Sequence, residues 1–192
     1  MKWIIIVIIL FMGGYTYLTL HFRKPNRSYE PYNDLKNRGQ NHNLLTAGYQ
    51  RVTLTAAEPT NEQPVESTVV ATPAPGGIPE ELKNSLFDQP VLPESYANLH
   101  APASINSLLP FRVILDCTLA DNQQQFVSAY LYVKNDRIYI VPEFEKLAGE
   151  LQSRTRSAHV QLLLPGGVIK SGHYQVVLVG RASSLGWPLQ VN

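Results

Sequence analysis

Residues 111–141, FRVILDCTLADNQQQFVSAYLYVKNDRIYIV, carry the pattern that decides the fold class. Apolar and polar side chains alternate over 111–119, which is the period of two expected for a half-buried strand. Residues 126–133 form a second run, rich in aromatic and aliphatic side chains. The polar residues 134–136 have the composition of a tight turn, so the sequence predicts a hairpin onto a third strand at 137–141.

The sequence beyond residue 141 predicts one helix and two further strands. Pro142 followed by acidic residues is typical of the first turn of a helix. Four apolar residues then recur at helical spacing and would form one apolar stripe: Phe144, Leu147, Ala148 and Leu151. Residues 159–164 and 173–179 are apolar runs of strand length, and a Pro-Gly-Gly turn follows the first of them.

Together these elements predict the α+β fold class, with a small five-stranded β-β-β-α-β-β domain at residues 111–192. A five-stranded oligonucleotide/oligosaccharide-binding (OB) barrel has the same order, with its helix between strands three and four. An open five-stranded sheet with one helix packed across it has this order too. A chain of about eighty residues is long enough for either architecture, so the OB-like barrel and the open sheet both remain.

The N-terminus is the most apolar part of the chain. Residues 3–20, WIIIVIILFMGGYTYLTL, contain no charged side chain. As a helix this run would extend roughly 27 Å, close to the ~30 Å hydrocarbon core of a bilayer. A cleaved signal peptide would have a shorter apolar region that ends in a small-x-small site, which this run lacks. We therefore predict a transmembrane anchor over residues 1–22, bounded by Trp3 and Leu20, with the lipid bilayer as its partner.

The residues after the anchor bear on its orientation. Arg23, Lys24 and Arg27 follow the apolar run. Basic residues beside a span favour the cytoplasmic side, where they would face anionic lipid headgroups. Long domains, however, often cross the membrane whatever their charge, and the rest of this chain is rich in Ser, Thr, Gln and Asn. These two indications conflict; we expect a single-pass membrane protein whose C-terminal domain is extracytoplasmic.

The middle of the chain divides by composition into three segments. Residues 23–50 form a basic juxtamembrane segment, and residues 51–77 form a Pro/Thr/Glu-rich linker that we expect to be flexible. Between residues 51 and 110 there are nine prolines, and seven acidic residues against two basic ones. Within 78–110, Pro79 and the acids after it predict a short helix, followed by an extended segment that packs on the domain.

Residues that could carry catalysis are few. Cys117 shares the apolar face of a predicted strand with its neighbours two positions away, which is typical of an inert core cysteine rather than a nucleophile. His159 and His173 each begin a predicted strand, and two histidines without a third ligand make a weak zinc site. The sequence contains no GxSxG, HExxH or P-loop motif. We therefore expect a protein that is not an enzyme and has no cofactor or metal.

A binding surface has more support in the sequence. Tyr130 and Tyr132 lie on one face of the second predicted strand, and Arg137 and Tyr139 alternate along the third. If these strands pair, the four side chains could form a ligand-binding face on which bases or sugars stack. The alternative is that the tyrosines face a hydrophobic core. The formal net charge of the chain is only +1, so no nucleic acid is expected as a partner.

Two hypotheses for the function follow. The first is a single-pass membrane-anchored protein whose small non-catalytic domain docks to another membrane or envelope component. The alternative is an OB-like module that binds an oligosaccharide or a single-stranded polymer through the tyrosine face. The first hypothesis accounts for the anchor and the linker together, because a tethered domain has a high local concentration near a membrane-bound partner.

Overall fold

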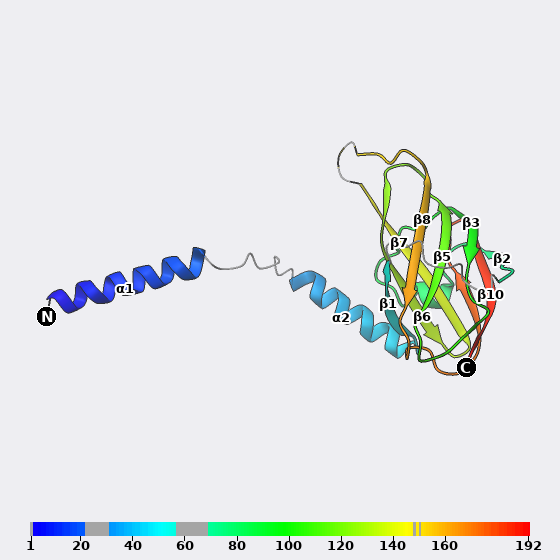
Figure 1. The fold of residues 1–192 in the computed structure, drawn as a ribbon, viewed down its shortest axis with the longest axis horizontal. Coiled ribbons are helices and arrows are strands. Elements are labelled where there is room, and N and C mark those ends of the chain that lie inside the picture. Colours follow the sequence, from blue (N-terminus) through cyan, green and yellow to red (C-terminus); the bar gives the residue numbers. More distant parts are fainter. Residues whose placement is uncertain (1, 22–30, 57–68, 148, 150) are drawn as a thin grey trace. The chain divides into compact units, whose positions relative to one another are not determined.

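The structure is a computed structural model, and it describes residues 2–21, 31–56, 69–147, 149 and 151–192. The chain divides into two compact units, residues 1–37 and 38–192 (Figure 1). In the first unit, helix α1 (Lys2–His21) confirms the predicted apolar helix. Its residues 2–19 are long and apolar enough to cross a membrane, and none of that stretch is buried.

Helix α2 (Pro31–Thr46) ends in a glycine cap that turns the chain into the first strand. Gly48 has a φ of +82°, a left-handed conformation that glycine adopts without steric cost. The Tyr49 N–H donates to the Leu44 carbonyl at 2.8 Å, and the Gly48 N–H donates to the Leu45 carbonyl at 3.0 Å. These are the two hydrogen bonds of a Schellman motif. Strand β1 begins directly after this cap, at Gln50.

The second unit is built on a sheet of ten strands, counted over the residues that the structure describes. They are β1 (Gln50–Ala56), β2 (Thr72–Pro75), β3 (Ser95–His100), β4 (Ser104–Ile105), β5 (Phe111–Thr118), β6 (Gln124–Lys134), β7 (Arg137–Lys146), β8 (Ser157–Leu164), β9 (Gly172–Leu178) and β10 (Ser183–Val191). The order along the sheet is β2-β10-β9-β7-β6-β1-β8-β5-β3, and β4 adds to β10 in parallel. One short helix, α3 (Glu80–Lys83), lies between β2 and β3.

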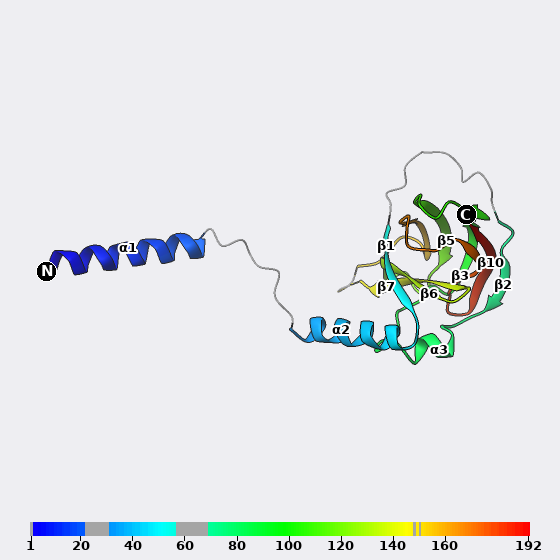
Figure 2. The same ribbon diagram turned by 90° about the horizontal axis from the view of Figure 1, so that it is seen from below.

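Strand β1 joins two halves of this sheet. Its residues 50–54 pair with β6, and its last two residues, Thr55 and Ala56, pair with β8. The segments that lead into β10 and β3 meet where the Arg181 N–H donates to the Pro93 carbonyl at 2.8 Å and the Ala182 N–H donates to the Glu94 carbonyl at 3.0 Å. The sheet therefore curls into a half-barrel around one interior (Figure 2).

The interior of the half-barrel holds the main hydrophobic core. On β5 the inward positions alternate as the sequence predicts, with Val113, Leu115 and Cys117 all buried. Trp187 on β10 is among the largest fully buried side chains. Removal of such apolar surface from water is the dominant favourable term in folding, at about 25 cal/mol per Å².

A second hydrophobic cluster lies on the other face of the sheet, and we call it the outer core. Its buried members are Leu44, Tyr49, Leu82, Leu92, Tyr132, Tyr139, Val141 and Val179. Because side chains alternate along β7, Ile138 and Ile140 enter the main core while Tyr139 and Val141 enter the outer core. The end of α2 and the segment containing α3 therefore cover the outer face of β6, β7 and β9.

The strand count in the prediction is wrong, although the predicted strands themselves are present. The runs predicted from the sequence correspond to β5, β6, β8 and β9, and to the first half of β7. Ten strands rather than five form the sheet, so the count fits neither the five-stranded OB-like barrel nor the five-stranded open sheet. Strand β10 has apolar residues at alternate positions, but Gly186 and Pro188 between them are residue types depleted in strands.

The predicted helix beginning at Pro142 is also wrong, because β7 continues through Pro142 to Lys146. Phe144 pairs with Phe126 of β6, and their rings make an edge-to-face contact with centroids 5.6 Å apart. Burial of Phe144 in the main core thus outweighs the local helical spacing. Of the predicted apolar stripe, Ala148 lies outside the described residues and Leu151 is exposed.

Part of the segment predicted as a linker consists of strands. Most of β1 and all of β2 lie within residues 51–77, whereas residues 57–68 lie outside the described part of the chain. Val52 and Leu54 of β1 show the alternation of a strand, but the run is too short to stand out beside the proline-rich sequence that follows. Residues 78–110 contain α3, β3 and β4, so the expected short helix is present.

Candidate functional site

The structure brings the four predicted binding residues together at the β6–β7 hairpin. Tyr132 lies directly opposite Tyr139 in the hairpin register. Both rings are buried in the outer core, and burial raises the pKa of Tyr132 to about 12. Tyr130 is half-buried, and the Arg51 guanidinium lies 3.9 Å from its ring centroid. Arg137 is exposed, and its hydrogen bond with Tyr139 raises its pKa.

The burial of these rings has a direct structural cause. The Schellman cap at the end of α2 directs Leu44 and Tyr49 onto the sheet, and Leu82 of α3 joins them in the outer core. Two rings that would have to stack on a ligand, those of Tyr132 and Tyr139, are therefore covered by the chain itself. The surroundings of Tyr132 and Tyr139 therefore match the alternative interpretation, in which the tyrosines face a hydrophobic core.

A shallow hollow of about 390 Å³ remains at the edge of this cluster. It is lined by Tyr49, Glu81, Lys134, Asn135, Asp136, Arg137 and Tyr139. The Lys134 ammonium lies 3.1 Å from the Glu81 carboxylate and 4.9 Å from the Tyr49 ring centroid. Of the predicted site, Arg137 and Tyr139 line this hollow.

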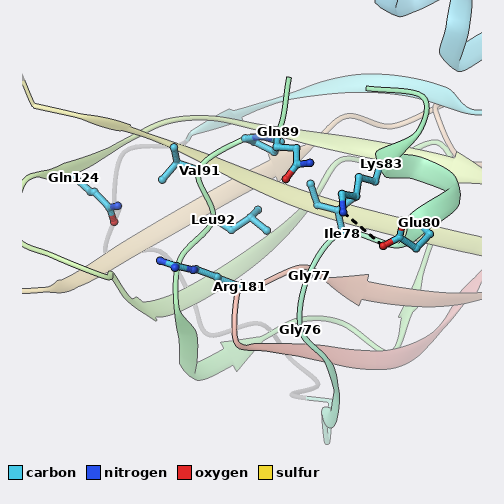
Figure 3. A pocket seen from close by; sticks show the side chains of 11 residues that line it. Gly76, Gly77, Ile78, Glu80, Lys83, Gln89, Val91, Leu92, Gln124 and Arg181 are labelled. Atoms are coloured by element: carbon cyan, nitrogen blue, oxygen red, sulfur yellow. Dashed lines mark ion pairs between the residues drawn. The ribbon is translucent and has the colours of Figure 1, made fainter. Parts of the chain in front are cut away.

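A second hollow, of about 420 Å³, lies where the chain crosses from β2 to β3, and we call it the strap cleft (Figure 3). Its lining consists of Gly76, Gly77, Ile78, Glu80, Lys83, Gln89, Pro90, Val91, Leu92, Gln124 and Arg181. Residues 76–83 and 89–92 supply most of this lining. Gln124 comes from the start of β6, and Arg181 comes from the connection between β9 and β10.

Both sides of the strap cleft are held by main-chain hydrogen bonds. The Gly77 N–H donates to the Gly180 carbonyl at 2.8 Å, and a Cβ on Gly76 would clash with the backbone of Ala182. The Phe144 N–H donates to the Val91 carbonyl at 3.0 Å, which places Val91 beside β7 as an isolated bridge. The cleft is therefore preformed, and ordering it on binding would cost little conformational entropy.

The strap cleft is lined by apolar, uncharged polar and charged side chains. Ile78, Val91 and Leu92 supply the apolar part. Its two cations each lie near a carboxylate, Lys83 at 3.6 Å from Glu80 and Arg181 at 3.7 Å from Glu94. The side-chain oxygen of Gln124 is buried and accepts no hydrogen bond within the described residues.

A polar row crosses three strands on the other half of the sheet. The Asn98 side-chain amide donates to the Asp116 carboxylate at 3.0 Å, and His159 Nδ1 lies 2.6 Å from the other carboxylate oxygen. The hydrogen bonds with His159 and Asn98 hold the pKa of the Asp116 carboxyl below its usual value. Cys117, the next residue, points into the main core, where burial raises its thiol pKa to about 11. This thiol is therefore protonated at neutral pH and faces away from the imidazole.

The other residues singled out from the sequence lie away from the strap cleft or outside the described part of the chain. His173 is exposed and lines a third hollow of about 420 Å³ beside Asp136. Trp3 is exposed on α1, while Arg23, Lys24 and Arg27 lie outside the described residues. Leu20 lies in α1. Within the described part of the chain, no three His, Cys, Asp or Glu side chains gather closely enough to hold a metal ion.

The chain matches no protein-family model, and no curated protein or solved structure is significantly similar to it. Gln124 and Arg181 join the cleft from distant parts of the sequence, so no local pattern marks them. The local signal for this cleft is Gly76-Gly77, because adjacent glycines after a proline-rich run permit a close approach of backbones.

Replacement of Tyr132 tests whether the tyrosine rings are structural. We expect Tyr132→Ala to lower the free energy of unfolding by about 3–5 kcal/mol, because a large buried ring leaves a cavity in the outer core. Tyr132→Phe, which keeps the ring, should cost much less, because it leaves the outer core filled. Chemical denaturation of the detergent-solubilised chain measures both. A stability of Tyr132→Ala equal to that of the parent chain would contradict a structural role.

The Asp116 carboxyl offers a test by titration. We expect His159→Ala to raise the pKa of Asp116 towards its ordinary value, because the largest cause of the lowered pKa is removed. Since the folded-state pKa is depressed, the contribution of this carboxylate to stability is present at neutral pH and disappears as the pH falls through that pKa. Carboxyl NMR titration measures the change, with Asn98→Ala expected to give a smaller shift. An unchanged midpoint in His159→Ala would refute this account.

Proposed function

We propose that this chain is a single-pass membrane-anchored protein whose β domain lies outside the cytoplasm and docks, without catalysis, to another membrane or envelope component. The strap cleft is the docking site, and its occupant is an extended, uncharged polypeptide segment of that partner. The observation that carries the proposal is the preformed strap cleft in a unit separate from the apolar helix α1.

The anchor is supported by its length and composition. Helix α1 contains an apolar stretch of eighteen residues, which spans roughly 27 Å at 1.5 Å per residue. This is close to the hydrocarbon thickness of a bilayer, about 30 Å. Exposed Trp3 at one end and Tyr15 and Tyr17 towards the other are the residue types enriched at membrane interfaces.

The character of the strap cleft supports a polypeptide ligand. Its volume falls within the range of roughly 300–1,000 Å³ that is typical of small-ligand sites. Gln89 and Gln124 can donate to and accept from main-chain groups, while Val91 and Leu92 offer apolar contact to a side chain. The pairing of both cations with carboxylates reduces any preference for a charged ligand.

The alternative, an OB-like module for an oligosaccharide or a single-stranded polymer, has less support. Tyr132 and Tyr139 are buried, so their rings are not available for stacking in this structure. Such a ligand would have to use the hollow beside Arg137, where Lys134 is paired with Glu81. We therefore favour docking of a partner protein.

The anchor is tested by membrane extraction in a bacterial host. We expect the parent chain to remain in the membrane fraction after alkaline carbonate treatment. Ile6→Asp combined with Ile9→Asp should release it, since each Asp costs about 2.5–3.5 kcal/mol near the centre of a span. Ile6→Leu with Ile9→Leu is the matched control and should stay membrane-bound. Release of the parent chain would refute the anchor. The orientation is tested by fusing alkaline phosphatase after Asn192; an inactive fusion would refute a β domain outside the cytoplasm.

The strap cleft is tested with a displayed library of random dodecapeptides panned against the full chain in detergent micelles. We expect enriched peptides to bind Val91→Arg at least about tenfold more weakly than the parent chain, because the arginine would fill the cleft. Val127→Arg is the matched control, since Val91 and Val127 are 44% and 48% exposed and Val127 does not line the cleft. Thermal unfolding checks that both variants fold. Peptides that bind Val91→Arg and Val127→Arg equally well would contradict the proposal.

A further inference from the structure

Two adjacent leucines stand out on the surface of the β domain. Leu108 and Leu109 are 78% and 61% exposed, and they lie between β4 and β5. A single exposed leucine needs no explanation, but an exposed pair held at one turn is a candidate contact surface. We call residues 106–110 the leucine turn.

The leucine turn is held by hydrogen bonds within itself. The side-chain oxygen of Asn106 accepts from the Leu108 N–H at 2.9 Å, which closes an Asx turn. The Asn106 carbonyl accepts from the Leu109 N–H at 3.2 Å. These two bonds constrain the backbone that carries both leucines.

Neighbouring segments hold the turn from outside as well. The Ser107 N–H donates to the Asn192 carbonyl at 2.9 Å, and the Gly167 N–H donates to the Ser107 carbonyl at 2.6 Å. A Cβ on Gly166 would clash with the Leu108 carbonyl, so the glycine allows the β8–β9 connection to pack directly against the turn. The two leucines are therefore presented on a rigid support, which lowers the entropy lost when they are buried.

The two segments that form the leucine turn and its support carry basic side chains but no acidic ones. Residues 101–112 and 164–175, which contain the turn and the β8–β9 connection against it, include no acidic residue. They include Arg112 and Lys170, and the Lys170 side chain is exposed. His173 adds little to this positive charge, because it lines a hollow together with Asp136. An apolar projection whose supporting connection carries an exposed lysine is complementary to a bilayer surface that contains anionic lipids.

We infer that the leucine turn inserts into the interface of a lipid bilayer, as a second membrane contact of the chain. The inference rests on the proposed function, because α1 supplies the bilayer. Two leucines alone would bind a membrane weakly, but an anchored domain samples the surface at a high effective concentration. The exposed Lys170 adds attraction to anionic headgroups near the surface.

The test uses the full chain reconstituted into vesicles of phosphatidylcholine with a minority of phosphatidylglycerol. Cys117→Ser serves as the background, and Leu109→Cys carries an environment-sensitive fluorophore. Leu151→Cys is the matched control, because Leu151 is 65% exposed and lies far along the chain from the turn. We expect the label at 109 to lose roughly half of its emission to nitroxide-bearing lipids, since interfacial insertion reaches about 5–10 Å into the headgroup and acyl boundary. The label at 151 should keep its emission and be quenched by aqueous iodide.

Three results would overturn the inference, and they are distinguishable. Equal quenching of both labels by iodide would show that the turn stays in water. Protection of the label at 109 from both quenchers would show that a protein surface covers it. A chain that fails to float with the vesicles would refute the anchor of the proposed function and the inference with it.

A second variant leaves the leucines in place. In the labelled chain, Lys170→Glu should reduce lipid quenching of the label at 109 in the vesicles with phosphatidylglycerol, but not in vesicles of phosphatidylcholine alone. Equal quenching of the parent chain and Lys170→Glu in both vesicle types would overturn the electrostatic part of the inference.

Discussion

The double pairing of strand β1 is the constraint on which the rest of the β domain depends. β1 pairs with β6 through residues 50–54 and with β8 through Thr55 and Ala56. Without β1, two separate sheets would remain, one made of β2, β10, β9, β7 and β6 and the other of β8, β5 and β3. Each would expose an apolar face to water. The hydrogen bonds from Arg181 and Ala182 to residues 93 and 94 then bring together the segments that lead into β10 and β3. One shared interior, rather than two small ones, gives the chain enough buried surface to fold.

The same strand explains why the tyrosine face is covered. The Schellman cap at Gly48 leads directly into β1, so the end of α2 must lie close to the strand that β1 pairs with, β6. Leu44 and Tyr49 then reach the rings of Tyr132 and Tyr139, and Leu82 of α3 completes the outer core. A sheet with apolar side chains on both faces needs cover on both, which the half-barrel interior and these helices provide.

The surfaces that we assign to function are connections between strands rather than strands themselves. The strap cleft is formed mainly by residues 76–83 and 89–92, and the leucine turn joins β4 to β5. Both are held by main-chain hydrogen bonds to neighbouring segments, and glycines allow the close approaches. Binding residues are commonly carried on loops that a rigid scaffold positions.

Local pattern alone determined a good part of this protein. The uncharged run at residues 3–20 predicts α1 by length and composition. Period-two alternation predicts β5, and apolar or β-rich runs of strand length predict β6, β8 and β9, because these signals need no knowledge of partners. Long-range pairing decided the rest. Phe144 lies in a strand because it pairs with Phe126. Trp187 lies in β10, which pairs with β2 and β9 although it contains Gly186 and Pro188. The cleft joins Gln124 and Arg181 to residues far away in sequence. Only the curl of the sheet brings such residues together, since contacts between distant segments leave no periodic trace in the chain.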